Sequence, residues 1–79
     1  MRRDIRNFLK KVCGRHIHVD DNDSLLENGI IDSLTMIELL TFIERRFGVT
    51  VKDDELIPEN FETIDAISCF LKQKLNSLH

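Results

Sequence analysis

The chain has 79 residues, of which 42% are hydrophobic and 32% are charged, and its formal net charge is −3. These values are typical of one small soluble domain, and they argue against a disordered chain and against a pocket that encloses a large substrate. Residues 1–19 are basic and residues 20–65 are strongly acidic. The acidic segment repels polyanions, so we expect no nucleic-acid partner.

The first predicted element is an amphipathic helix from about Arg3 to Cys13, followed by Gly14 in the position of a C-terminal cap. Its basic residues are interpreted as a solvated face. Residues 14–32 then form a long loop, a length that is unusual in so small a domain and often functional. The apolar residues expected to pin this loop to the helices are Ile17, Val19, Leu25 and Leu26.

The second predicted helix spans about Ser33 to Phe47 and ends at Gly48. The residues expected on its inward stripe are Met36, Leu40, Ile43 and Phe47, with Leu39 beside them. In the next connection, residues 49–51 alternate like a strand but are too few to form a sheet. Residues 53–57 predict a short helical turn that ends before Pro58.

The last predicted helix spans about Ile64 to Leu75, with Thr63 as its N-cap. Together the elements predict an all-α fold: a small four-helix bundle of three longer helices and one short one, with a long first loop. Residues 1–79 are expected to form a single domain.

Membrane insertion finds little support in the sequence. No apolar run approaches the ~20 residues needed to span a bilayer, and the polar first residues lack the apolar stretch of a signal peptide. We therefore expect a cytoplasmic chain with no membrane span.

Cys13 and Cys69 are too few for a disulfide scaffold, although a bond between them stays open. His16 and His18, together with Cys13, lack zinc-site spacing, and His79 stands apart at the end of the chain. A calcium loop beginning at the acidic residues 20–23 would need glycine and glutamate where Leu25 and Ile31 stand. No metal site is expected.

The start of the second helix carries the clearest signal. The turn-forming pair Asn28-Gly29 leads to Asp32 and Ser33, either of which can cap a helix. A helix N-terminus also favours an anionic group, so a serine here could carry a phosphodiester. A plain helix cap is the alternative, and these residues alone do not decide between the two. No serine–histidine–aspartate arrangement supports catalysis.

The run Gly29-Ile30-Ile31-Asp32-Ser33-Leu34 resembles the attachment motif of the acyl carrier and peptidyl carrier protein family. The resemblance covers nearly the whole chain, including the first helix, the long loop, the turn at 47–49 and the segments 54–56 and 61–64. The triplet Asp-Ser-Leu occurs twice, at residues 23–25 and 32–34, but only Ser33 opens a long periodic helix. Ser24 is therefore interpreted as a decoy.

The resemblance implies that Ser33 receives a 4′-phosphopantetheine arm from coenzyme A, attached by a separate phosphopantetheinyl transferase that Asp32 helps to position. The thiol of the arm would hold an acyl or aminoacyl group as a thioester, so the chain itself is expected to be non-catalytic. The resemblance further implies an acyl- or aminoacyl-loading ligase and downstream acyl-processing enzymes as partners. The carrier is expected to be a monomer.

The second helix is also expected to be the docking surface for partners. Leu34, Ile37 and Thr41 form a partly apolar strip, and Glu38 and Glu44 flank it as acids for basic partner patches. Ordinary packing is the alternative for Leu34 and Ile37.

The chain differs from carriers of fatty-acid biosynthesis in its basic first helix, in Thr35 and in the pair Arg45-Arg46. These differences predict an acyl carrier of a specialised lipid or secondary-metabolite pathway. The alternatives are a standalone aminoacyl or D-alanyl carrier and, more distantly, a helical adaptor without a prosthetic group.

Overall fold

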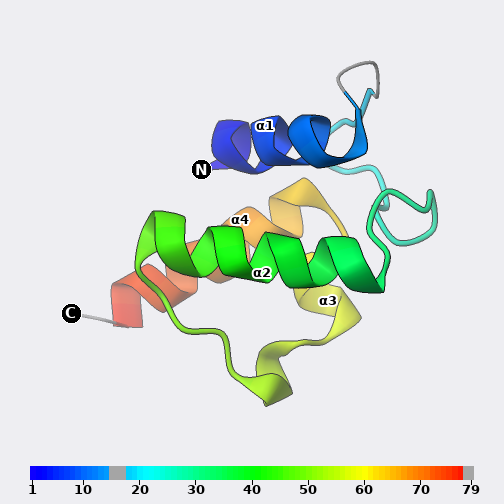
Figure 1. The fold of residues 1–79 in the computed structure, drawn as a ribbon. Coiled ribbons are helices and arrows are strands. Elements are labelled where there is room, and N and C mark those ends of the chain that lie inside the picture. The colour runs from blue at the N-terminus through cyan, green and yellow to red at the C-terminus, as the bar shows by residue number, and fades with distance from the viewer. Residues whose placement is uncertain (15–17, 78–79) are drawn as a thin grey trace.

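The computed structural model describes residues 1–14 and 18–77. These residues form no strand, and their helices follow the order α1 (Arg2–Cys13), α2 (Ser33–Phe47), the 3₁₀ helix η1 (Asp53–Glu55), α3 (Pro58–Phe61) and α4 (Ile64–Ser77). In Figure 1, α2 crosses the front of the molecule, with α1 above it, α4 behind it and α3 below. The all-α prediction of three longer helices and one short helix is confirmed.

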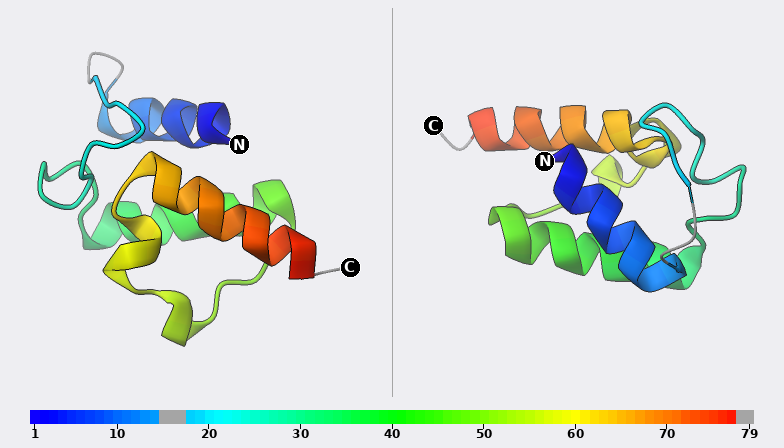
Figure 2. Two further views of the ribbon diagram at one scale, coloured as in Figure 1. Left: turned by 180° about the vertical axis from the view of Figure 1, so that it is seen from behind. Right: turned by 90° about the horizontal axis from the view of Figure 1, so that it is seen from above.

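Helix α1 buries one apolar face and pairs part of its basic face. Ile5 and Leu9 are fully buried, because residues four positions apart share a helix face. The helix contacts both α2 and α4, and it crosses above α2 with its N-terminus beside α4 (Figure 2). Arg2 forms an ion pair with Asp65 on α4. The interpretation of the basic residues as a purely solvated face was therefore wrong in part.

The first loop is tied to the bundle over the part that the structure describes. Leu25 is fully buried, and its N–H donates to the carbonyl of Glu62 at 2.8 Å. Asp21 accepts a hydrogen bond from the N–H of Asp65 at 2.9 Å and pairs with Arg6 through its carboxylate. The prediction holds for the buried Val19 and Leu25, whereas Leu26 is exposed. Ile17 lies outside the described residues.

Helix α2 begins and ends where the sequence predicts, but its buried stripe is rotated. Gly48 ends the helix in the left-handed conformation, with φ of 69°. The buried residues are Thr35, Leu39 and Ile43, while Met36 and Leu40 are only partly buried. Both stripes fit a 3.6-residue period, and the neighbouring helices select the row at i, i+4 and i+8. The predicted inward stripe holds in part: Ile43 is fully buried, whereas Met36, Leu40 and Phe47 pack against the core only partly buried.

The connection after α2 contains two short elements instead of one. The 3₁₀ helix covers only Asp53–Glu55, and Pro58 begins a second short helix, α3. Proline suits the first position of a helix because its missing N–H would have no helical partner there. The predicted short helical turn before Pro58 is therefore present but shorter, as η1, and the separate helix α3 that begins at Pro58 was not predicted. Thr63 caps α4 as predicted, because its hydroxyl accepts a hydrogen bond from the N–H of Ala66 at 2.9 Å.

The core lies between α1, α2 and α4 and is closed below by α3. Its aromatic centre is Phe61, which is 1% exposed and contacts Phe70 at 5.4 Å between ring centroids. The largest other side chains buried completely are Ile5, Leu9, Leu25, Leu39, Ile43, Ile64, Ile67 and Leu71. Among the described residues, no helix combines the length and apolar character that a membrane span requires.

Candidate functional site

Ser33 is the first residue of α2, and its side chain is exposed to solvent. The preceding residue, Asp32, is extended, and its carboxylate accepts a hydrogen bond from the N–H of Thr35 at 2.8 Å. The backbone carbonyl of Asp32 accepts from Met36, also at 2.8 Å. Asp32 thus supplies the cap, and the Ser33 hydroxyl is not needed for it.

The capping hydrogen bonds also set the charge of Asp32. The N–H of Thr35 and then the Thr35 hydroxyl stabilise the carboxylate, and they hold the pKa of Asp32 below its usual value. Asp32 is therefore ionised at neutral pH. The helix start thus combines a fixed carboxylate with an exposed hydroxyl.

Ser24, in the second Asp-Ser-Leu triplet, lies in a different environment. Its hydroxyl accepts a hydrogen bond from the N–H of Glu27 at 3.2 Å, and its carbonyl accepts from the side chain of Asn28 at 2.7 Å. These bonds close a turn in the first loop and do not begin a helix. Of the two triplets, only the one at Ser33 combines an exposed hydroxyl with the start of a long helix.

Both cysteines are free thiols, which decides the question of a disulfide. Cys13 is partly buried, and its thiol donates to the carbonyl of Ile30 at 3.2 Å. Burial raises the pKa of the Cys13 thiol, and the negative charges of Asp32 and Glu38 raise it further. Cys13 is thus a poor nucleophile, although it lies near the start of α2. Cys69 is exposed on α4.

The histidines give no metal centre in the described part of the chain. His18 is exposed, and its ring lies 3.3 Å from a carboxylate oxygen of Asp20. His16 and His79 lie outside the described residues. Within residues 1–14 and 18–77, no three histidine, cysteine, aspartate or glutamate side chains are placed to hold a metal ion.

The predicted docking strip lies on the surface of α2. Leu34 is 65% exposed and Ile37 is 61% exposed, so most of each side chain faces solvent instead of the core. Glu38 and Thr41 are also exposed, and the Thr41 hydroxyl donates to the carbonyl of Ile37 at 3.0 Å. Glu44 is partly buried, and its carboxylate accepts a hydrogen bond from the N–H of Val51 at 2.9 Å. Glu44 therefore holds the connection that follows α2.

Three further apolar side chains on the surface were not predicted: Leu26, Leu56 and Ile57. They line an open cavity of about 200 Å³ together with Met36, Pro58 and Phe61. Met36 lies one helical turn after Ser33, so the cavity opens beside the start of α2. The one sequence feature that pointed to this cavity was the pair Leu56-Ile57. These two large apolar residues stand in a connection whose apolar residues show no helical period.

Comparisons with known proteins agree with this arrangement. The family described as "Phosphopantetheine attachment site" matches residues 3–71. The chain is 32% identical to a D-alanyl carrier protein of Bacillus velezensis over 78% of its own length and 81% of that protein. It is 30% identical to an acyl carrier protein of Petrotoga mobilis, over 86% and 84% of the two chains.

The fold matches that of a solved carrier as well. The solution structure of the holo acyl carrier protein of Nitrosomonas europaea superimposes with a TM-score of 0.77 at 29% identity, covering 91% of this chain and 92% of that one. The fold and the capped serine helix are those of a phosphopantetheine-dependent carrier. The chain belongs to the carrier-protein family, whose prosthetic group is covalent 4′-phosphopantetheine.

Proposed function

We propose that this chain is a non-catalytic acyl carrier that holds its cargo on a 4′-phosphopantetheine arm attached to Ser33. The observation that carries the proposal is the exposed Ser33 hydroxyl at the first position of the capped helix α2. The site suits a phosphodiester, because the helix N-terminus stabilises negative charge and the serine has no structural task. When bound, the arm supplies a thiol that forms the thioester with the cargo.

The side chains around Ser33 present the attachment site to partner enzymes. Asp32 fixes the helix start for the phosphopantetheinyl transferase, and Leu34 and Ile37 offer apolar contacts that their exposure leaves available. Glu38 adds negative charge and Thr41 continues the strip. Glu44 borders the strip and holds the following connection in place. Docking of this kind is fast and salt-sensitive.

The cavity beside α2 favours a small acyl group as the cargo. Its volume is about 200 Å³ and all six lining residues are apolar. For scale, an apolar cavity of about 150 Å³ accommodates benzene. A short or branched acyl group would fit there, whereas a long fatty chain would extend into solvent. The basic α1 and Arg45-Arg46 favour a dedicated loading ligase and dedicated downstream enzymes over the general fatty-acid enzymes.

An aminoacyl cargo is the second candidate. The observation that favours it is the similarity to the D-alanyl carrier protein of Bacillus velezensis, at 32% identity over 78% of this chain. An aminoacyl group carries an ammonium group, which gains nothing from an apolar cavity. The two candidates therefore differ in whether the cargo leaves solvent.

Intact-protein mass spectrometry tests attachment. The purified chain is incubated with coenzyme A and a broad-specificity phosphopantetheinyl transferase, and the modified peptide is then mapped. We expect one added arm on the wild type, none on Ser33→Ala and one on the matched control Ser24→Ala. We expect Ser33→Ala to fold, because the substitution leaves the Asp32 cap intact. Circular dichroism checks this for each variant. A folded wild type that gains no arm, beside a control carrier that does, favours the adaptor alternative.

Thermal melts test the cargo. The holo-protein is loaded chemically with short acyl groups of increasing length or with an alanyl group, and each form is melted. We expect the melting temperature to rise with acyl length until the cavity is filled, and the alanyl form to melt like the unloaded holo-protein. The matched variant Ile57→Ser should remove the rise. Identical melts for all forms would contradict burial of the acyl cargo and leave the aminoacyl candidate.

A further inference from the structure

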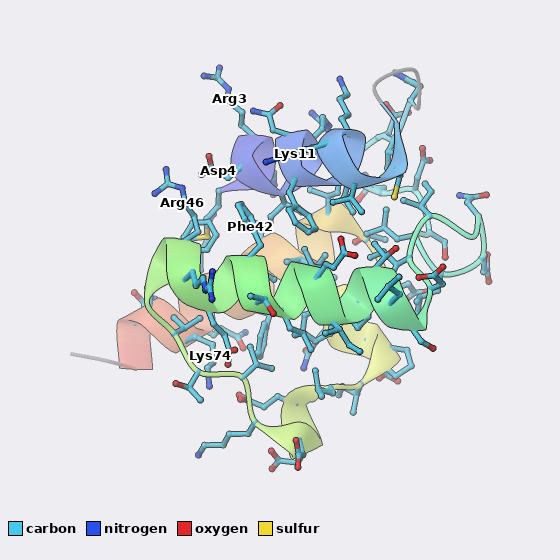
Figure 3. The ribbon with its side chains drawn as sticks, viewed as in Figure 1. Arg3, Asp4, Lys11, Phe42, Arg46 and Lys74 are labelled. Carbon is cyan, nitrogen blue, oxygen red and sulfur yellow. The ribbon has the colours of Figure 1, made fainter. Side chains whose placement is uncertain are left out.

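A second surface lies between α1 and α2, toward the C-terminal end of α2, and it shares Glu38 and Thr41 with the docking strip. It is an open groove of about 400 Å³, lined by Phe8, Glu38, Thr41, Phe42, Arg45 and Arg46. Figure 3 shows Phe42 directed toward α1. Phe42 stacks on Phe8 at 4.7 Å between ring centroids and meets Phe47 edge-on at 6.4 Å. The groove thus has an aromatic floor that is only partly buried.

The rim of this groove is basic. Arg45 lies one turn after Phe42 on α2 and lines the groove, and Lys11, outside the lining, lies one turn after Phe8 on α1 (Figure 3). Both are exposed, and neither forms an ion pair with the residues that the structure describes. Arg46 lies 3.8 Å from Asp4 across the groove. By contrast, Arg2 and Arg6 on the same helix α1 are paired with acids.

We propose that this groove binds an acidic amphipathic helix of a partner protein. One apolar side chain of that helix packs on Phe42, and its carboxylates pair with Lys11 and Arg45. The chemistry of the groove selects this occupant, because an apolar floor inside a cationic rim complements an apolar stripe flanked by acids. Glu38 lies at the end of the groove nearer Ser33 and repels acids there, so the acids of the partner helix are expected over the end at Arg45 and Arg46.

Other anionic partners fit the groove less well. Nucleic acid binding draws its affinity from many phosphate contacts, and the groove is lined by two cations, Arg45 and Arg46, of which Arg46 already faces Asp4. An anionic membrane is recognised by clusters of about four to eight basic residues. The rings of the aromatic floor stack on each other and are partly buried between two helices, which disfavours their insertion into a bilayer. A protein helix can reach the floor with a single side chain.

This inference goes beyond the carrier function, because the groove includes neither Ser33 nor the arm. Arg45 is twelve residues after Ser33, which corresponds to about 18 Å along the helix. A partner could therefore hold the C-terminal part of α2 while the Ser33 end stays accessible to active sites. Such retention would raise the effective concentration of the cargo at those sites.

The test is an NMR titration of the isotopically labelled apo-protein, so that attachment at Ser33 plays no part in it. The probe is a synthetic helical peptide with one leucine and phenylalanine stripe flanked by glutamates. The control peptide replaces every glutamate by glutamine. We expect amide shifts centred on Phe8, Lys11, Phe42 and Arg45, with affinity that falls as salt rises, and no such shifts with the control peptide.

Charge variants make the test specific. Lys11→Glu combined with Arg45→Glu should weaken binding about tenfold or more. The matched control combines Arg3→Glu with Lys72→Glu, which changes the charge equally at exposed positions outside the groove, and should leave most of the affinity. Asp4→Asn should strengthen binding, because it releases Arg46 from its acid. Circular dichroism confirms that the variants fold.

Several results would overturn the proposal. Shifts centred on Leu34 and Ile37 would assign the peptide to the strip beside Ser33. If the double variant in the groove and the control double variant lost affinity equally, net charge alone would explain the binding. Tighter binding of single-stranded DNA or of anionic vesicles than of the peptide would mean a different class of partner. Self-association of the wild type that the groove pair abolishes would make a second copy the occupant.

Discussion

The two ends of α2 differ in charge, in apolar character and in what surrounds them. At the N-terminal end, Asp32 caps the helix and Leu34 stands exposed beside Ser33. At the C-terminal end, Arg45 and Arg46 occupy the last turn beside partly buried aromatic rings. Acids at the start of a helix and bases at its end interact favourably with the helix dipole and so stabilise the helix. The charges alone therefore have an ordinary structural explanation.

What the dipole does not explain is the apolar surface at each end. Leu34 and Ile37 are more than half exposed, although a fold of this size has few apolar residues to spare. At the other end, the rings of Phe8 and Phe42 stack but stay partly accessible. The comparison teaches that one helix can present two surfaces of opposite charge, each with its own apolar contacts.

The largest expected effect is on the free energy of unfolding, when a buried leucine of α2 and an exposed one are each replaced by alanine. Leu39→Ala should lower the free energy of unfolding by about 2–5 kcal/mol, because Leu39 is 0% exposed and its removal leaves a cavity. Leu34→Ala should change it by less than about 0.5 kcal/mol but slow attachment of the arm. Urea unfolding and attachment rates measure the two quantities.

The milder Leu39→Val serves as the core variant if Leu39→Ala does not fold. Equal losses of stability at positions 39 and 34 would break the comparison, since Leu34 would then be a packing residue. An unchanged attachment rate in Leu34→Ala would remove Leu34 from the proposed docking strip.

The charge of Asp32 should give the next largest effect, and it should depend on pH. Hydrogen bonds lower the pKa of Asp32 in the folded state, so its contribution to stability is present above the unfolded pKa of about 3.9 and is lost as the pH falls through the folded pKa. Asp32→Asn keeps a capping oxygen and removes the charge. Urea unfolding should therefore show the wild type more stable than Asp32→Asn at neutral pH, with the difference shrinking below about pH 4.

Asp32→Ala is the companion variant, because it removes both the charge and the capping oxygen. It should be less stable than Asp32→Asn at every pH. A difference between wild type and Asp32→Asn that stays constant from neutral to acidic pH would contradict the role of the ionised carboxylate.

The ends of α2 were predictable from sequence, whereas its buried face was not. Asp32 and Gly48 are local signals, because a cap and a left-handed glycine act within one turn of the chain. The choice between Met36 and Thr35 as an inward residue depends on where α1 and α4 lie, and periodicity allows both. Sequence reasoning preferred the more apolar side chain, but Thr35 is 9% exposed in the fold.

The candidate site divides in the same way. Ser33 was predicted from its position at the start of a periodic helix; the structure shows it exposed there, and its modification stays a prediction. The cavity beside it could not be predicted, because its residues come from the first loop, α2 and the segment around Pro58. Helix α3 has four residues, which is too short for a periodic pattern. Glu44 was predicted as a docking acid from its sign, but its hydrogen bond to Val51 depends on the path of the following connection.

The smallest expected effect separates Arg46 from Arg45 at the C-terminal end. Both arginines lie in the last turn and interact equally with the dipole, but only Arg46 also lies 3.8 Å from Asp4 and 5.9 Å from the centre of the Phe47 ring. Arg46→Gln should therefore cost up to about 1 kcal/mol more than Arg45→Gln in urea unfolding. High salt should reduce this difference without removing it, because salt screens the exposed ion pair more than the contact with the ring. An equal cost for the two substitutions would mean that the dipole alone accounts for the effect of both arginines. The ion pair with Asp4 would then be negligible, and Asp4→Asn would not make Arg46 more available to a partner.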